Sequence, residues 1–469
     1  MSEIPTGIDY SKRYSILAAV MVGNIMGPID ASIVNVVLPT IAQYFGVGVP
    51  TAQWVPMVYL LTIGSLLMFY GRLGDILGYK KIYLSGLAGF IVASALCGFS
   101  PSIYWLIIFR AMQGFAAGMF MSMPFAIITA AFPPQERGKA LGINAISISA
   151  GLALGPSLGG FLTSFLGWRS VFLINIPIGI AALFWGRRLV PNFKGRPARI
   201  DVLGVLFGCL SLLFILLFVN RFQNPGSTTI TYFLLLASIA AVIAFLMLEN
   251  SVPEPMLNLG LFRNVTFSLA SISALLNFMA QYIMVFLTPF YLQRVLHFEP
   301  DRVGLIMTSF PFAVMAVAPF SGALSDRIGT SLLAFTGAGL CTLSLFLMSR
   351  LPVAAGPADI IWRVAVFGVG TGIFQSPNNS AAMGSAPKQH LGIASGILSA
   401  VRTVGMAMGI AVGGAVLSAF VSPPVLQNAS LHSAESDAFL TGLKYAYMTG
   451  SALTGIAAVT SLVRRKDRK

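Results

Sequence analysis

Charged residues are scarce in this chain of 469 residues, of which only 9% are Asp, Glu, Lys or Arg. Soluble domains carry about 25% charged residues. Because 56% of the residues are hydrophobic and the mean hydropathy is +0.83, a water-facing surface could not be built from this composition. The composition therefore excludes a soluble protein and predicts a chain embedded in a membrane.

Cysteine and histidine are rare as well, with three residues of each. Cys97, Cys209 and Cys341 lie far apart in apolar runs and form no C-x-x-C spacing, which excludes a disulfide framework and a zinc site. The apolar runs also lack a nucleophile–base pair or a cluster of acidic ligands. We therefore expect no metal, no cofactor and no enzymatic activity.

Long polar segments are missing too. No stretch between the apolar runs exceeds about 25 residues, so a receptor or scaffold with a soluble signalling domain is disfavoured. The formal net charge of +14 does not indicate a nucleic-acid partner, because there is no soluble basic domain to hold one. Orientation in the membrane and contact with anionic lipid headgroups explain that charge.

Apolar runs of about 20 residues, the length needed to cross a bilayer, fill most of the chain. Counting them predicts fourteen spans, at about 15–41, 51–71, 80–99, 102–125, 139–165, 168–188, 200–219, 230–249, 265–292, 302–323, 331–350, 359–385, 391–420 and 441–463.

Two halves of the chain repeat one another. The glycines of Gly142–Gly160 align without a gap on those of Gly396–Gly414, and Gly71–Gly78 matches Gly322–Gly329 at nearly the same offset. Parallel repeats around a central site are typical of secondary transporters. The repeat predicts an all-α membrane protein with a six-helix bundle at 1–190, an inserted helix pair with its linkers at 191–260, and a second six-helix bundle at 261–469. The inserted pair has few polar residues, so we expect it to face lipid and bridge the halves.

The distribution of Lys and Arg predicts the orientation, because cytoplasmic loops carry an excess of both. With fourteen spans, twenty of these residues fall on the side that holds both termini and seven fall on the other side. We therefore expect both termini to be cytoplasmic, in the cell membrane, and we expect the protein to act as a monomer.

Five motifs in order give the chain a resemblance to the major facilitator superfamily, and specifically to its fourteen-span drug:proton antiporters of the multidrug efflux type. They are Asp30-x-Ser-x-Val-Asn35-Val-x-Leu-Pro39, Gly71-x-x-x-Asp75-x-x-Gly78-x-Lys80-Lys81, Arg110-x-x-Gln113-Gly114, Gly151-x-x-x-Gly155-Pro156-x-x-Gly159-Gly160 and Trp168-Arg169-x-x-Phe172-x-Ile174-Asn175-x-Pro177-x-Gly179. The resemblance implies proton-driven efflux of lipophilic, often cationic, drugs by alternating access between two bundles.

Asp30 lies in the middle of the first apolar run, where a carboxylate costs roughly 2.5–3.5 kcal/mol on insertion scales. Such a group can carry a proton in one state and attract a cationic substrate in another, so we predict it as the proton-coupling and substrate-charge site. Arg110, in the fourth run, comes out at nearly the same depth at 1.5 Å per residue and is the expected partner. The alternative for Asp30 is a structural carboxylate locked to an arginine, and for the pair a permanent ion pair.

Arg402 is a third intramembrane charge, in the thirteenth run, and its counterpart in the repeat is Ile148. Either it binds an anionic group or it satisfies backbone carbonyls, and its helix packs at the interface between the halves in the family. Anion binding belongs to an alternative function, the export of a lipid or amphipathic anion recognised by Arg110 and Arg402.

Two further groups of residues complete the expected site. Polar and aromatic residues on the helices that line the cavity in the family are candidates for substrate contact, although hydrogen bonding between helices would explain the polar ones equally well; they are Asn35, Asn277, Gln281, Phe286, Asn378 and Asn379. The loop and fifth-helix motifs are candidates for gating: Gly71, Asp75, Gly78, Lys80, Lys81, Asp326, Gly151, Gly155, Pro156, Gly159 and Gly160. Asp75 and Asp326 would face helix N-termini from short cytoplasmic loops, while the glycines allow close packing and Pro156 kinks its helix.

Overall fold

The computed structural model describes residues 12–133, 136–192, 202–221, 228–252, 259–352, 355–387, 391–421 and 433–464. All elements in these ranges are helices. They are α1 (Arg13–Phe45), α2 (Val49–Ala52), α3 (Trp54–Leu77), α4 (Tyr79–Gly98), α5 (Ile103–Ser122), α6 (Pro124–Ala131), α7 (Arg137–Leu166), α8 (Ser170–Leu173), α9 (Asn175–Leu189), α10 (Val202–Arg221), α11 (Thr228–Ser251), the 3₁₀ helix η2 (Leu259–Arg263), α12 (Val265–Arg294), α13 (Pro300–Ile328), α14 (Thr330–Met348), α15 (Pro357–Ser385), α16 (Leu391–Phe420) and α18 (Ser433–Val463).

The predicted spans agree with these helices. Thirteen of the described helices are long and apolar enough to cross a membrane, and the bent pair Val49–Leu67 and Phe69–Leu77, at 53°, makes a fourteenth. The predicted span 168–188 is divided by a short break into α8 and α9, and the predicted span 102–125 ends too early, because α6 continues the span to Ala131. The all-α membrane architecture is therefore confirmed.

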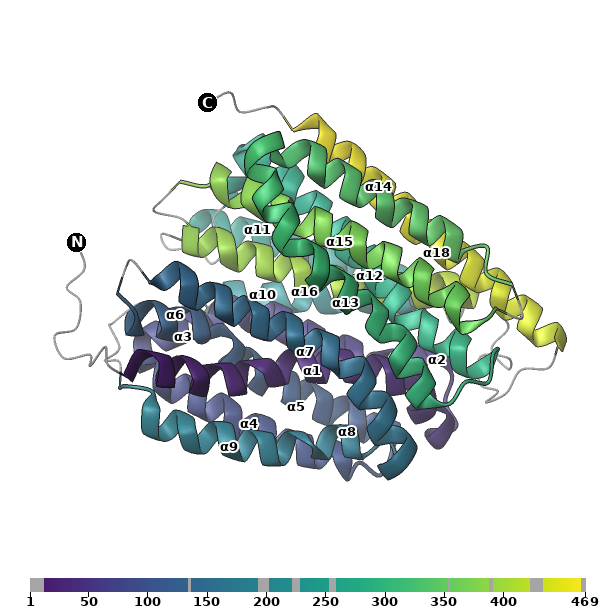
Figure 1. The fold of residues 1–469 in the computed structure, drawn as a ribbon, viewed down its shortest axis with the longest axis horizontal. Coiled ribbons are helices and arrows are strands. Elements are labelled where there is room, and N and C mark those ends of the chain that lie inside the picture. The colour runs from purple at the N-terminus through teal and green to yellow at the C-terminus, as the bar shows by residue number, and fades with distance from the viewer. Residues whose placement is uncertain are drawn as a thin grey trace.

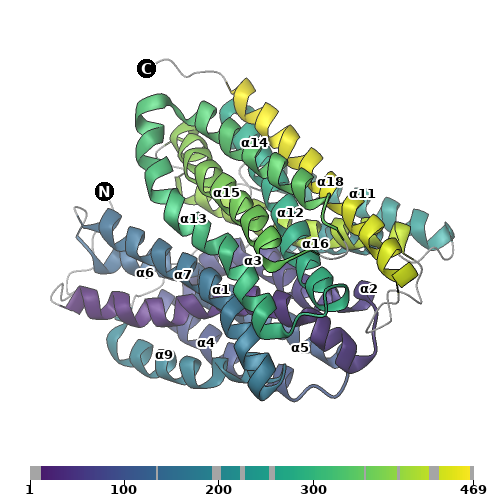
Figure 2. The same ribbon diagram turned by 45° about the vertical axis from the view of Figure 1, so that its right-hand side comes forward.

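The chain folds into two helical bundles (Figures 1 and 2). Helices α1 to α9 form the first bundle, drawn from purple to blue, and α12 to α18 form the second, drawn from green to yellow. Figure 1 shows that α1 begins and α18 ends at the same end of the molecule. Toward the opposite end the two bundles converge, so that α13 lies across α7 in both views.

Packing follows the repeat. Glycines on one face of α7 lie against backbone oxygens of α1, and the equivalent glycines of α16 lie against α12. The matched contacts are Gly151 on Ile25 and Gly405 on Leu275, then Gly155 on Ile29 and Gly409 on Met279. Glycine permits this approach because it has no side chain to separate the helices. In this register Asp30 of α1 is equivalent to Ala280 of α12.

The turn between the second and third helices of each bundle is also repeated. Gly78 separates α3 from α4 with φ +91°, and Gly329 separates α13 from α14 with φ +93°. A side chain with a Cβ rarely adopts such a conformation, so glycine is required at both positions. Asp75 and Asp326 were expected in loops, but each lies in the last turn of its helix, because a single glycine suffices to reverse the chain.

Hydrogen bonds join the two bundles at the end where they converge. Gln293 of α12 donates from Nε2 to the Val36 carbonyl oxygen at 2.9 Å and accepts from Thr40 Oγ1 at 3.1 Å. The hydroxyls of Ser157 and Thr308 lie 2.6 Å apart between α7 and α13. On the predicted orientation this end faces outward.

Helices α10 and α11 are the least buried of the candidate spans, with 17% and 11% of their most apolar windows buried, against 72% for α12. Helix α10 packs against α3 of the first bundle and α16 of the second, while α11 packs mainly against α10. The inserted pair thus covers the outside of the seam between α3 and α16.

Candidate functional site

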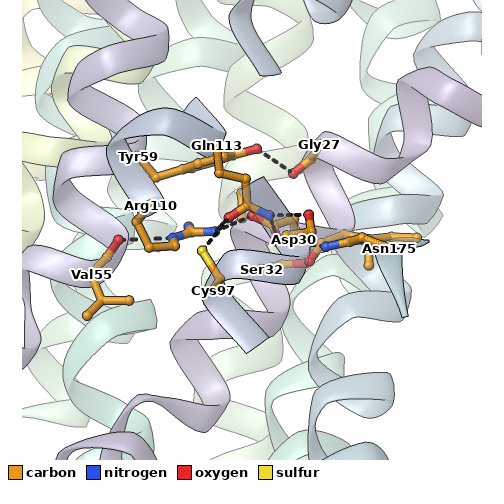
Figure 3. Close-up of polar contacts among 12 residues, drawn as sticks. Gly27, Asp30, Ser32, Val55, Tyr59, Cys97, Arg110, Gln113 and Asn175 are labelled. Carbon is orange, nitrogen blue, oxygen red and sulfur yellow. Dashed lines mark hydrogen bonds and ion pairs between the residues drawn. The ribbon is translucent and has the colours of Figure 1, made fainter. Parts of the chain in front are cut away.

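Asp30 is the centre of a polar cluster inside the first bundle (Figure 3). Its Oδ2 accepts a hydrogen bond from Arg110 Nη1 of α5 at 2.5 Å, in an ion pair whose side chains are both completely buried. Its Oδ1 accepts from Gln113 Nε2 of α5 and from Asn175 Nδ2 of α9, each at 3.0 Å. The predicted Asp30–Arg110 contact therefore exists, and three donors on two other helices hold the carboxylate.

Arg110 is held from several sides. Its Nε donates to the Val55 carbonyl oxygen at 3.2 Å, its Nη1 also donates to Gln113 Oε1 at 2.7 Å, and its guanidinium carbon lies 4.1 Å from the centre of the Tyr59 ring. Stacking on an aromatic face stabilises a desolvated cation. Its Nη2 is buried and finds no hydrogen-bond acceptor among the described residues. One nitrogen of the cation, with its two N–H groups, is therefore left for a further partner.

Gln113 connects the ion pair to α4. Its Nε2 also donates to Ser94 Oγ at 2.8 Å, and Cys97 Sγ lies 3.7 Å from its Oε1. Gln113 and Asn175 were read only as parts of motifs, and their roles at Asp30 were missed. The signal was a fully apolar run interrupted by an amide, although sequence alone could not show that both amides face the same carboxylate.

The second bundle has no such cluster at the equivalent positions. Gly114 on Tyr59 and Gly368 on Phe310 fix the register of α5 with α15, while Gly86 and Gly337 do so for α4 and α14. Apolar residues, all buried, then replace Asp30, Ser94, Cys97, Arg110 and Gln113, namely Ala280, Leu345, Met348, Val364 and Phe367. The bundle therefore packs well without charges at this level, and the cluster is specific to the first half.

The residues predicted to contact substrate separate into two groups. Asn35 and Phe286 are buried in helix packing, with Asn35 Nδ2 donating to the Ala31 carbonyl oxygen at 2.7 Å and Phe286 lying edge-on to Phe290. Asn378 is buried too; it donates to the Ala270 carbonyl oxygen at 3.1 Å and accepts from Arg464. Of these contacts, only those of Asn378 join different helices. Asn35 bonds within α1 and leaves its Oδ1 buried without a partner among the described residues, and Phe286 contacts Phe290 within α12.

Three other predicted residues, Asn277, Gln281 and Asn379, make fewer contacts with the protein. Gln281 Oε1 is buried without a hydrogen-bond partner in the described parts of the chain, and so are both polar atoms of the Asn277 side chain, apart from the weakly polar Cys341 thiol beside it. Asn379 is exposed. Buried polar atoms without partners are costly, so a water molecule or a ligand group is expected to reach Asn277 and Gln281.

Arg402 lies in the middle of α16 with its side chain partly exposed. It forms no hydrogen bond and no ion pair with the residues that the structure describes, in contrast to Arg110. Tyr282 of α12 lies within electrostatic range of both Arg402 and Tyr59. Arg402 and the Asp30 cluster thus approach the same central region from opposite bundles.

The predicted loop residues lie at the end of the bundle where α3 meets α4. Asp75 is exposed and accepts a hydrogen bond from the Tyr79 hydroxyl at 2.7 Å. Gly71 has open space around it, Lys80 is partly buried and Lys81 is exposed. The side chain of Asp326 lies outside the described residues.

The glycines of α7 lie where predicted for close packing. A Cβ on Gly155 would overlap Ser32 Oγ, and one on Gly159 would lie 2.8 Å from Ile33 Cγ1. At Gly160 the neighbour is the backbone of Pro300 and Asp301 in the other bundle. These glycines therefore hold α7 against α1 and also against α13.

Pro156 also takes part in the contact between the bundles. Its carbonyl oxygen lies where a Cβ on Gly304 of α13 would have to be placed. Two glycines, Gly160 and Gly304, thus face each other across the seam, and a larger residue at either would force the bundles apart.

Comparisons with known proteins agree on the family. The model of the Major Facilitator Superfamily matches residues 20–410 and 270–468. The chain is 31% identical to the riboflavin transporter RibZ of Clostridioides difficile (strain 630), over 97% of this chain and 99% of the relative. It is 35% identical to the multidrug resistance protein Stp of Mycobacterium tuberculosis (strain CDC 1551 / Oshkosh), over 87% and 76% respectively.

A solved structure shows the same fold. A bacterial homologue of the human lysosomal transporter Spinster, in an inward-facing and unoccupied conformation, superposes with a TM-score of 0.69 at 17% identity and covers 96% of both chains.

Proposed function

Because the chain belongs to the Major Facilitator Superfamily, a family of transporters, we propose that it exports lipophilic small molecules across the cell membrane in exchange for protons. Relatives named for multidrug and methylenomycin A resistance support export of drug-like compounds, and the relative named for riboflavin widens the substrate range. We further propose that the protein acts as a monomer with both termini in the cytoplasm.

The observation that carries this proposal is the buried Asp30–Arg110 pair. Protonation of Asp30 removes one of the two charges, which weakens the contact with Arg110 and with the two amide donors on Oδ1. Loss of a proton restores the contact. A single protonation event therefore changes the attachment of α1 to α5 and α9, which is what a proton-driven conformational change requires.

A purely structural role for the pair is less well supported. If the fold needed an ion pair at this level, the second bundle would need one as well, yet Ala280 and Val364 are found there. Burial of an ion pair is seldom favourable for stability compared with apolar packing. The cluster is therefore better explained by its chemistry than by packing.

Alternating access supplies the second element of the proposal. The seam formed by α7 and α13 closes one end, the outer end on the predicted orientation, through Gly160, Gly304 and the Ser157–Thr308 contact. Export requires this seam to open and the opposite end to close. The glycines allow the helices to separate and return without interlocked side chains.

Cationic drugs were expected from the family resemblance, with Asp30 as their counter-charge. In this conformation both carboxylate oxygens are occupied by protein donors. A cation would thus compete with Arg110, and we propose that Asp30 attracts a cation only in a state in which Arg110 has moved.

The test is drug-driven proton release. Purified protein in weakly buffered detergent should release protons when a transported compound binds, and proteoliposomes should move that compound against its gradient when a pH gradient is imposed. Asp30→Asn should abolish both effects, whereas Asp359→Asn, which removes an exposed carboxylate paired with Arg363, should leave both intact. Proton-driven transport at the normal rate in Asp30→Asn would exclude Asp30 as the coupling site.

A further inference from the structure

Arg402 is an intramembrane cation that the proton-coupling cluster does not use. It lies eleven residues after Leu391, the first residue of α16, and therefore roughly 16 Å from that end at 1.5 Å per residue. Arginine at such a depth costs roughly 2.5–3.5 kcal/mol on insertion scales. A charge of this kind is expected to have a partner.

Within the described ranges Arg402 has neither a hydrogen-bond partner nor an ion-pair partner, although Tyr282 lies within electrostatic range. If its role were to satisfy backbone carbonyls, the guanidinium would donate to one, as Arg110 does to Val55. Arg402 makes no such bond, and its side chain stays partly exposed. The structural explanation therefore lacks the contact that it predicts.

The position of Arg402 in the repeat also argues against a scaffold role. The glycine register of α7 and α16 aligns Arg402 with Ile148. The first bundle thus has the carboxylate cluster without this cation, and the second has the cation without the cluster. The two chemistries are divided between the halves.

Arg402 lies close to the surface where the halves meet. The next residue, Thr403, packs on Gly64 of α3, where a Cβ would lie 3.1 Å from Thr403 Cγ2. The same helix carries Tyr59, whose ring covers Arg110. A molecule bound between the halves at this level would have the cluster on one side and Arg402 on the other.

The net charge of this region favours an anion. Asp30 and Arg110 neutralise each other in their ion pair, so Arg402 contributes a positive charge that no carboxylate of the described residues pairs with. Protonation of Asp30 makes the region more positive still. Attraction between charges is strong where little water screens it.

On these grounds, and resting on the proposed export function, we infer that Arg402 recognises an anionic or strongly hydrogen-bond-accepting group on the substrate. The transported compounds then include amphipathic anions with an acidic group on an aromatic or aliphatic body. Arg110 keeps its Nη2 for a further partner, but its Nε and Nη1 are engaged by Val55, Asp30 and Gln113. We therefore assign the recognition of the anionic group to Arg402.

Two fluorescent probes of one scaffold and opposite charge test the inference. Proteoliposomes with an imposed pH gradient are assayed for transport of carboxyfluorescein, an anion, and of a rhodamine ester, a cation. Arg402→Gln should lower transport and binding of the anion by about ten- to one-hundred-fold, the range of one charge-assisted hydrogen bond. The cation should be transported at an unchanged or higher rate.

Two variants keep the result interpretable. Arg402→Lys retains the charge and should restore most of the anion transport, which a role in packing alone would not produce. Arg350→Gln removes an exposed arginine at the end of α14 and serves as the matched control, with no expected effect on either probe.

Three outcomes would overturn the inference. Equal losses for both probes in Arg402→Gln would indicate a structural role, and no loss for either would indicate no role. Wild-type protein that transports only the cation under a proton gradient would refute the inference and leave the proposed function standing, whereas transport of neither probe would count against the proposed function itself.

Discussion

Removal of the charge from Asp30 should destabilise the protein as well as uncouple it, and a second substitution should repair only the stability. The single variant is Asp30→Asn, which keeps the shape of the side chain. The double variant adds Arg110→Met, which removes the facing cation and fills the space of its aliphatic stem. Both positions are completely buried.

The expected magnitude follows from the contacts of the pair. Without the carboxylate, the Arg110 guanidinium keeps two neutral acceptors, the Val55 carbonyl and Gln113 Oε1, and the aromatic rings of Tyr59 and Phe172. Breaking a buried ion pair by removal of one partner costs about 3–5 kcal/mol, whereas replacement of both partners by uncharged residues is often nearly neutral. We therefore expect a loss of about 3–5 kcal/mol in Asp30→Asn and recovery of most of it in the double variant.

The assay is reversible unfolding by urea in detergent, extrapolated linearly to zero denaturant. Each 1.4 kcal/mol corresponds to about a tenfold change in the unfolding equilibrium, so a loss of this size is easily resolved. Proton-driven transport in proteoliposomes is measured on the same preparations and should be absent in both variants. Energy-independent exchange of labelled substrate across the membrane checks that the double variant can still change conformation.

Two results would refute this reasoning. Wild-type stability in Asp30→Asn, followed by a lower stability in the double variant, would mean that Arg110 has no need of a counter-charge. Restored proton-driven transport in the double variant would mean that protons are carried elsewhere.

Four other changes test the seams and the inserted pair. Gly155→Leu would force α1 and α7 apart and should abolish coupled transport while substrate binding persists. Pro156→Ala should cause a weaker form of the same defect. Coupling is measured as transported substrate per proton, and normal coupling in both variants would contradict the gating role of α7. Gly304→Leu should prevent α13 from closing against α7, so that this end of the transporter stays open. The accessibility of cysteines introduced on that side would report the opening. Unchanged accessibility would argue against a closed seam there. Replacement of residues 200–249 by a flexible linker should leave the two bundles able to assemble and to bind substrate, because the repeat omits this segment. The stability of the variant should be lower. Loss of binding in a monodisperse, correctly oriented variant would place part of the site on the inserted pair.

The fold could be predicted from the sequence because each membrane helix is recognisable from its own run of apolar residues. Every backbone group in lipid must be satisfied within its own helix, so an apolar run of the right length has few alternatives. Boundaries such as 391–420 agree to the residue with α16. The break between α5 and α6 was missed because Met123 and Pro124 lie inside one continuous apolar run.

The site was predictable to a smaller extent. Asp30 and Arg110 were found because a charge in an apolar run is rare and because helix rise fixes its depth. Rotation about the helix axis is not fixed in this way. Asn378 was therefore expected to face substrate but bonds Ala270 and Arg464, and Asn175 was passed over although it binds Asp30.

The placement of α10 couples the motion of the two bundles to the surrounding bilayer. Helix α10 contacts both α3 and α16, and most of its surface faces the lipid tails. Any rocking of one bundle against the other must therefore move α10 relative to at least one of them. Viscous drag from those tails then acts directly on the moving seam. Turnover should consequently depend on the length and fluidity of the acyl chains.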